Sequence, residues 1–319
     1  MKNGHVLAVL IVVAGSSCRD EKDNDSENLS APTAPKLDEL DLDGPCLLEE
    51  RSGTFVIERY GEFLIVGGSL SDGPPPSTYF EVVGTEGSCK LYQRINPFCD
   101  PACSSGEICG LTQECVAYPE PQDLGVVSIL GLSEAVQMAA VEPSYKYADA
   151  SLPQSALVAG SPLLLTTEGG KIEDLELHGI GVEALVLTDE NKWVVTPQKG
   201  FSLHWDTTEH RDAEIVFRLQ IDQHGISPTS LLCDFEDNGE AEVPSAILQQ
   251  LVNSGVSGFP NATLTRRSSD HAKTAFGCVE LMVVSSMPGD IDIAGYVPCV
   301  DDDDCEENQV CDLALELCV

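Results

Sequence analysis

Alternation of apolar and polar residues is the main periodic signal in the chain, and it predicts strands. Residues 54–60 and 63–66 are rich in β-branched and aromatic side chains and are separated by Gly61, which predicts a hairpin. Residues 201–205 and 214–222 both alternate with period two, which predicts a second hairpin with one buried and one exposed face. Further strands are predicted at residues 79–83, 126–130, 163–166, 175–178, 184–187 and 193–195.

One helix interrupts the strands. Residues 244–253 begin with a proline at a first-turn position, end near Gly255 and carry an apolar stripe that should lie on the sheet. Many short strands with turn signals between them predict a mainly β fold. We expect an antiparallel β-sandwich with one short helix, together with a small β domain and two small disulfide-stapled cysteine modules.

Two blocks of four cysteines repeat one another. Each block has five residues between its second and third cysteines, and Gly106 in the first block matches Asn308 in the second. Gly and Asn most readily adopt positive φ, so both blocks are expected to turn at this position. The blocks contain Cys99, Cys103, Cys109 and Cys115 in the first, and Cys299, Cys305, Cys311 and Cys318 in the second.

Both modules are too small for a hydrophobic core, and disulfides are the expected substitute in an exported protein. A zinc site of four thiolates is the alternative, but such sites usually contain close C-x2-C pairs and neither block has one. Pairing of first with third and second with fourth cysteine is favoured, although four cysteines allow three connectivities. Outside the modules, we expect Cys46 to pair with Cys89, because they flank a group of predicted strands, and Cys233 to pair with Cys278, because they bracket the predicted helix.

The first 17 residues have the pattern of a secretory signal, with a weakly basic start, an apolar run at residues 6–14 and small residues at 15–17. As a helix this run would span only about 14 Å, against about 30 Å of bilayer hydrocarbon, so it predicts export rather than a membrane helix. Cys18 follows in a sequence that resembles a bacterial lipobox, although Gly15 stands where that motif usually has an aliphatic residue. Ordinary signal peptidase cleavage is the alternative.

The parity of the cysteines favours lipidation. Setting Cys18 aside as the anchor leaves 12 of the 13 cysteines, an even number that can all pair. Arg19 after the cysteine resembles the pattern for sorting to the outer membrane, on its periplasmic or surface face. The lipid anchor is therefore the predicted membrane contact of the chain.

The predicted organisation has six parts. The segment after Cys18 is acidic, poor in aromatic residues and broken by prolines, so it is expected to be a disordered tether, with an edge strand around residues 40–42 as the alternative. The parts are a signal peptide (1–17), an anchor and tether (18–44), a small β domain (45–97), a first cysteine module (98–118), a β-sandwich domain (119–297) and a second cysteine module (298–319).

Charge and motifs exclude several classes of function. The formal net charge is −36, with 17 Lys and Arg against 53 Asp and Glu, so no basic footprint for nucleic acid exists. The chain has no H-E-x-x-H, no G-x-S-x-G and no phosphate-binding glycine loop, and Ser257 lacks the spacing of a nucleophile elbow. No catalytic residue and no resident cofactor is predicted.

Two polar groups are candidates for metal ions. His204, Asp206 and His210 lie in or beside one predicted turn, but a solvated loop is the favoured interpretation. Residues 301–304 are four consecutive aspartates that suit calcium chemically, yet they lack the spaced pattern that wraps the ion, so an acidic turn is favoured.

The cysteine blocks resemble the short EGF-like or EB-type modules of predicted lipoproteins of myxobacterial type. The resemblance extends to residues 98–101, 118–119, 233–234, 255–260, 264–267 and 277–281. It implies an envelope location and a modular architecture, and it implies no activity.

The favoured function is a non-catalytic cell-envelope lipoprotein that binds or scaffolds a partner of unknown identity. One alternative is an envelope hydrolase whose carboxylates, such as Asp222, Asp234 or Glu280, converge only in the fold. A second alternative is calcium-dependent adhesion through the acidic second module.

Overall fold

The computed structural model describes residues 40–319 except residues 171, 173, 189–191, 210–212 and 222–227. The chain divides into two units, Met1–Pro32 and Thr33–Val319, and every described residue belongs to the second. The predicted signal peptide, Cys18 and the tether up to residue 39 lie outside the described residues. Within the described part, no helix is long and apolar enough to cross a membrane.

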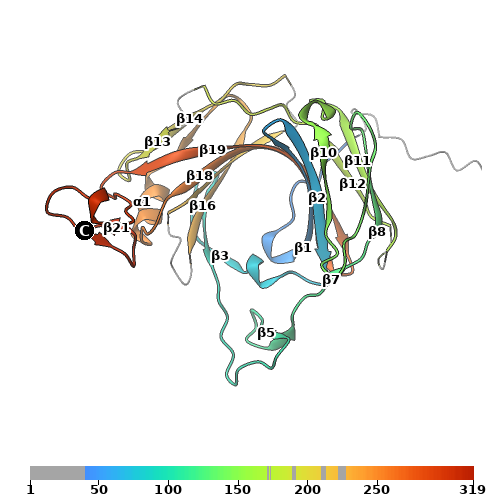
Figure 1. Cartoon of the computed structure of the whole chain (residues 1–319), viewed down its shortest axis with the longest axis horizontal. Coiled ribbons are helices and arrows are strands. Elements are labelled where there is room, and N and C mark those ends of the chain that lie inside the picture. Colours follow the sequence, from blue (N-terminus) through green and yellow to red (C-terminus); the bar gives the residue numbers. More distant parts are fainter. Residues whose placement is uncertain (1–39, 171, 173, 189–191, 210–212, 222–227) are drawn as a thin grey trace, which may run out of the picture. The chain divides into compact units, whose positions relative to one another are not determined.

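Within the described residues the fold is mainly β with one α-helix, as predicted, and its largest element is an eleven-stranded sheet, which we call the main sheet (Figure 1). The strand order is β10-β2-β1-β19-β18-β15-β16-β4-β3, with β7 beside β2 and β13 beside β19. All pairs are antiparallel except β1–β19 and β13–β19. The strands are β1 (Arg51–Tyr60), β2 (Phe63–Ser71), β3 (Phe80–Glu86), β4 (Cys89–Arg94), β7 (Pro121–Gln122), β10 (Tyr147–Pro153), β13 (Lys192–Val195), β15 (Glu214–Gln220), β16 (Thr229–Glu236), β18 (Asn261–Thr274) and β19 (Gly277–Ile293).

Two further layers cover one face of the main sheet, giving a sandwich-like arrangement. A four-stranded sheet consists of β8 (Gly125–Leu130), β9 (Val136–Ala139), β11 (Pro162–Gly169) and β12 (Glu176–Ile180). The second layer contains the paired strands β14 (Phe201–His204) and β17 (Glu240–Val243) and the helix α1 (Ser245–Asn253). The helix starts after Pro244, as predicted, and all four residues of its apolar stripe are buried.

Each layer encloses its own hydrophobic core against the main sheet. The first core joins β1, β2 and the start of β19 to the four-stranded sheet, through residues such as Phe55, Val127 and Leu281. The second joins β15, β16 and the start of β18 to α1, β14 and β17, through residues such as Phe217 and Leu248. Leu264 of β18 pairs with Met287 of β19, which is six residues from Leu281, so Leu264 and Leu281 point to the same side of the sheet. Both cores therefore lie on one face of the main sheet, which we call the core face.

The predicted hairpin of residues 54–66 is present as β1 and β2, with Gly61 at a φ of +58° in its turn. The second predicted hairpin is wrong, because β14 pairs with β17 while β15 pairs with β16 and β18. Phe201 of β14 packs edge-on against Phe217 of β15, with ring centroids 5.4 Å apart. The alternation identified the buried face of each strand correctly, but it does not say whether two such faces meet across a core or lie side by side in one sheet.

The strands of residues 45–97 do not form a separate sheet. β1 pairs with β19 and β4 pairs with β16, so this segment and the predicted sandwich of residues 119–297 share the main sheet. The expected boundary between a small β domain and a sandwich therefore does not separate their strands.

The two disulfides expected outside the modules are wrong in their pairing. The structure joins Cys46 to Cys278 and Cys89 to Cys233, across sequence separations of 232 and 144 residues. The reason is the strand order: Cys89 and Cys233 are direct partners in the β4–β16 ladder, and Cys46 lies five residues before Arg51, which begins β1 beside Cys278 of β19. Closing loops of this length stabilises the fold by about 5 kcal/mol each in the chain-entropy model.

The disulfides inside both modules are confirmed. Cys99 pairs with Cys109 and Cys103 with Cys115, while Cys299 pairs with Cys311 and Cys305 with Cys318. Gly106 and Asn308 have φ angles of +88° and +75°, as the matching turns required. Each module contains one short ladder, β5 (Glu107–Cys109) with β6 (Cys115–Ala117), and β20 (Cys311–Asp312) with β21 (Leu317–Cys318).

Candidate functional site on the charged face of the main sheet

The face of the main sheet opposite the core face, here called the charged face, carries ionic side chains from five neighbouring strands. Register places Glu214 of β15 directly beside Arg267 of β18, and Thr54 of β1 directly beside Glu280 of β19. Asp234 of β16 points to the same face, because its ladder partner is Val216, two residues after Glu214 in β15. The sheet order thus gathers groups that are far apart in the sequence.

Arg267 holds two carboxylates of the charged face together. Its Nε lies 2.7 Å from Glu214 Oε1 and its Nη2 lies 3.1 Å from Asp234 Oδ1. Burial raises the pKa of Asp234, nearby Glu214 raises it further, and Arg267 and Lys90 oppose both effects. Asp234 therefore holds a proton more readily than an ordinary aspartate, even with an arginine beside it.

An open cavity of about 710 Å³ lies where β15 begins and β16 ends. Residues Glu214 and Asp234 line it together with Thr207, Phe235 and Asn238. Drug-sized ligands occupy cavities of roughly 300–1,000 Å³ in proteins, so this space is large enough for a small molecule or for the side chains of a partner.

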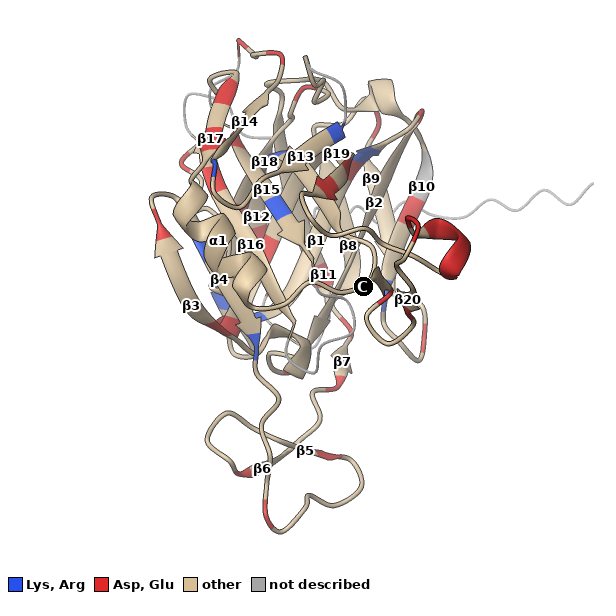
Figure 2. Ribbon diagram, turned by 90° about the vertical axis from the view of Figure 1, so that its left-hand side faces the viewer, with Lys and Arg blue, Asp and Glu red and all other residues tan. Residues whose placement is uncertain are grey.

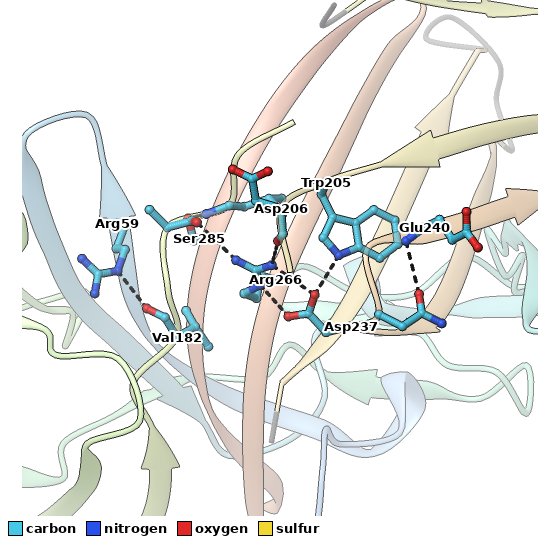
Figure 3. A network of polar contacts seen from close by, with 11 residues as sticks. Arg59, Val182, Trp205, Asp206, Asp237, Glu240, Arg266 and Ser285 are labelled. Carbon is cyan, nitrogen blue, oxygen red and sulfur yellow. Dashed lines mark hydrogen bonds and ion pairs between the residues drawn. The ribbon is translucent and has the colours of Figure 1, made fainter. Parts of the chain in front are cut away.

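A buried ion pair lies next to the cavity, since Asp237 is one of its lining residues (Figure 3). Arg266 Nε donates to Asp237 Oδ2 over 2.6 Å, and both side chains are only 1% exposed. Trp205 Nε1 donates to the other carboxylate oxygen over 2.7 Å, and Arg266 Nη2 donates to the carbonyl of Asp206 over 2.6 Å. Because the charges are matched and bonded inside the protein, this network fixes β18, β14 and the turn after β16 relative to one another.

Further hydrogen-bonded polar residues lie on the core face between the two hydrophobic cores, and together with the Arg266–Asp237 network they form a polar strip. Arg59 donates to the carbonyls of Gln154, Leu157 and Val182, and Ser285 accepts from the amide of Leu185. Within the described residues, no buried side-chain nitrogen or oxygen lacks a hydrogen-bond partner. A fully bonded strip of this kind positions structure and leaves no free group for a ligand.

Glu280 forms a second ionic centre on the charged face and is 0% exposed. It accepts from Arg51 Nη1 over 2.8 Å, from Thr54 Oγ1 over 3.1 Å and from the amide of Cys46 over 2.9 Å. Glu280 and Asp234 are therefore bonded to different arginines, and the structure does not bring these two predicted carboxylates together. Asp222, the third of that set, lies outside the described residues.

Of the two candidate metal groups, the aspartates of residues 301–304 have a structural role, and the group of His204, Asp206 and His210 is only partly described. Among the described residues, the groups of three potential metal ligands that lie close together are cysteines already engaged in disulfides. His210 lies outside the described residues, and the carbonyl of Asp206 accepts from Arg266. Asp301 and Asp304 cap the 3-10 turn η5 (Asp302–Asp304), and Asp302 Oδ1 accepts from the amide of Cys311 over 2.8 Å, so these carboxylates stabilise the fold of the second module.

Sequence reasoning missed Glu214, Arg267 and the Arg266–Asp237 pair. The adjacent arginines at 266 and 267 carried a signal: in a strand, neighbouring side chains point to opposite faces, so one of the two had to face the core and find a buried partner. Nothing local to the sequence identifies that partner as Asp237, which lies in a turn 29 residues earlier.

Fold and site together define a disulfide-stapled, mainly β protein with a charged sheet face. No protein family model and no curated protein sequence matches the chain. One solved structure to which it is similar, the crystal structure of chicken CNTN1 FN1-FN3 domains, has a TM-score of 0.21 at 7% identity, covering 70% of this chain and 77% of that one. A similarity of this size carries no argument about function.

Proposed function

We propose that this chain is an exported, non-catalytic binding protein of the cell envelope, anchored to the outer membrane by a lipid on Cys18. Its charged sheet face would hold a ligand or partner outside the cytoplasm. The observation that carries the proposal is the pairing of cysteines: all 12 described cysteines form six disulfides, and the sequence has 13. Disulfides of this number are typical of oxidising compartments, and lipidation would use the one cysteine left over.

The test is mass spectrometry of the unreduced mature protein isolated from the membrane fraction. We expect an acylated peptide that begins at Cys18 and no thiol available for alkylation until the protein is reduced. A Cys18→Ser variant should lose the acyl groups and leave the membrane fraction while keeping all six disulfides. A mature protein with an unmodified Cys18, or with its other cysteines reduced, would contradict the proposal.

An envelope hydrolase is the second candidate, and the cavity at the strand ends favours it. Glu214 and Asp234 line one space, and a carboxyl group with a raised pKa is the usual proton donor of an acid–base pair. Against catalysis, both carboxylates are bonded to Arg267, which neutralises charge that a general base would need. Turnover of ester, peptide or glycan substrates that disappears in both Glu214→Gln and Asp234→Asn, with the fold retained, would replace the binding proposal with this one.

A further inference from the structure

Three exposed apolar residues in and beside the second cysteine module form one row. Val310 and Val319 extend the β20–β21 ladder by one pair, since the amide of each donates to the carbonyl of the other, over 3.1 and 3.0 Å. Pro298 forms an antiparallel bridge with Leu317 of β21, and the same register sets Tyr296 opposite Val319. Tyr296, Val319 and Val310 therefore lie beside one another on three neighbouring segments, and we call them the apolar row.

The apolar row lies next to the point where the module packs on the rest of the protein. Leu317, two residues before Val319, points to the same side of β21 and is buried in the second core. Val310 and Val319 are 57% and 59% exposed, so the row lies beyond the edge of that core. Other large apolar residues of the module and its surroundings are also exposed, namely Val297, Val300, Leu313, Leu315 and Phe259. So many exposed apolar side chains in one small module are typical of a surface that another molecule covers.

The charged side chains of the second module are all acidic. Residues 298–319 contain no Lys or Arg, and their acidic residues are Asp301, Asp302, Asp303, Asp304, Glu306, Glu307, Asp312 and Glu316. The acidic turn η5 lies close to the apolar row, because the carboxylate of Asp302 accepts from the amide of Cys311, the residue after Val310 (Figure 2).

Three of these carboxylates are free to pair with a partner. The side chains of Asp303, Glu306 and Glu307 are exposed and make no hydrogen bond or ion pair with any residue that the structure describes. Glu307 is also only three residues before Val310, across the turn at Asn308. The module therefore presents apolar side chains beside unpaired charges of one sign.

We propose that the apolar row and the carboxylates beside it form a docking surface for a basic, amphipathic segment of a partner protein. The apolar side chains of that segment would cover the row, and its Lys or Arg side chains would pair with Asp303, Glu306 and Glu307. Burial of the apolar residues supplies affinity, while the complementary charges around them set the orientation and the choice of partner.

The charges of the module select this occupant over two others. A second copy of the chain would bring another acidic module against the first, in a protein of net charge −36. An anionic lipid surface would be repelled in the same way. The docking surface belongs to the second module and not to the charged face, so this inference adds a second site to the proposed binding function and rests on neither the cavity nor the lipid anchor.

The test measures the affinity of the full chain for labelled synthetic peptides by fluorescence anisotropy. The probe is a short amphipathic peptide of Lys and Leu, with two matched peptides in which Ser replaces Leu or Glu replaces Lys. We expect micromolar binding of the Lys–Leu peptide that weakens as salt is added, weaker binding of the Lys–Ser peptide and no binding of the Glu–Leu peptide. Val310→Ser together with Val319→Ser should weaken binding of the Lys–Leu peptide about tenfold or more, because two valines are no longer withdrawn from water. Glu306→Gln together with Glu307→Gln should weaken it too and reduce its dependence on salt.

Matched controls separate this surface from the general attraction of an acidic protein for a basic peptide. Val82→Ser together with Val83→Ser removes two valines of similar exposure, 51% and 45%, from the edge strand β3, and Glu81→Gln together with Glu86→Gln removes two exposed carboxylates of the same strand. Both controls should leave the affinity for the Lys–Leu peptide unchanged, and every variant should melt as the wild type does, because all the substituted side chains are exposed.

Four outcomes would each overturn the proposal. They are an equal loss of affinity in the β3 controls, equal affinity of the wild type for the Lys–Leu and Lys–Ser peptides, self-association of the wild type that the Val310 and Val319 substitutions abolish, and binding to phosphatidylglycerol vesicles but to none of the peptides. All four are independent of acylation at Cys18, so this inference and the lipid anchor can fail separately.

Discussion

Replacing Asp237 with asparagine removes the only carboxylate among the described residues that lies against the buried guanidinium of Arg266. Both side chains are 1% exposed, so neither charge can be rehydrated without opening the fold. In the variant, Arg266 would keep its bonds to the carbonyls of Ala184 and Asp206 but lose its counter-ion. Breaking one partner of a buried ion pair costs about 3–5 kcal/mol, and that is the loss expected in the free energy of unfolding.

The assay is equilibrium unfolding in urea, followed by tryptophan fluorescence, since Trp205 Nε1 donates to the same carboxylate. A matched control is Asp292→Asn, which breaks the Lys192–Asp292 pair at a similar distance of 2.8 Å but with side chains 57% and 56% exposed. The control should lose only a small part of what Asp237→Asn loses, because surface pairs contribute little. If the two variants lost equal stability, burial could not be the cause and the structural role of the Arg266–Asp237 pair would be refuted.

Three further predictions concern pH and covalent structure. The raised pKa of Asp234 means that the folded state binds its proton more tightly than the unfolded state, so this group stabilises the fold at low pH and the contribution is lost as pH rises through the folded pKa. The unfolding free energy at pH 4 minus that at pH 7 should therefore be smaller in Asp234→Asn than in the wild type. An unchanged value of this difference would contradict the assignment. Burial raises the pKa of Tyr147 to about 12, so its absorbance change in an alkaline titration should come after those of the exposed tyrosines and be missing in Tyr147→Phe. That variant should also lose about 1–3 kcal/mol of stability, because the buried amide of Leu124 donates to the Tyr147 hydroxyl over 2.8 Å. Replacing Cys89 and Cys233 together with serine should lower the melting temperature of the protein, whereas replacing both cysteines of either disulfide in the first module should leave the main transition in place, as a calorimetric scan would show.

The sequence predicted what depends on neighbours along the chain. The apolar stripe of the helix, the turn at Gly61 and the disulfides within each module involve residues fewer than 15 positions apart, and all are present in the structure. Non-local pairing was not predictable in the same way. The parallel β1–β19 contact joins residues more than 200 positions apart, and every error about Cys46, Cys89, Cys233 and Cys278 follows from not knowing it or the β4–β16 contact.

The candidate site illustrates the same limit in its chemistry. Asp234 was considered from the sequence as one carboxylate among many, and its significance comes from Arg267, Glu214 and Lys90, which three different strands bring to it. A carboxylate pattern can be counted in a sequence, but the sign and size of its electrostatic environment depend on strand order. The electrostatic environment of each side chain on the charged face therefore depends on strand order as well as on residue type.

The two cysteine modules show how one position can set the relation of a module to the rest of the protein. Leu317, directly before the last cysteine of the second module, is buried in the second core, and the amide of Gly258 donates to the neighbouring carbonyl of Leu315 over 2.7 Å. Glu114 holds the matching position in the first module and is exposed, and Figure 2 shows β5 and β6 standing apart from the main sheet. A carboxylate at that position could not enter an apolar core without losing its hydration. The same disulfide framework therefore packs into the second core in the module of residues 298–319 and stands apart from the main sheet in the module of residues 98–118.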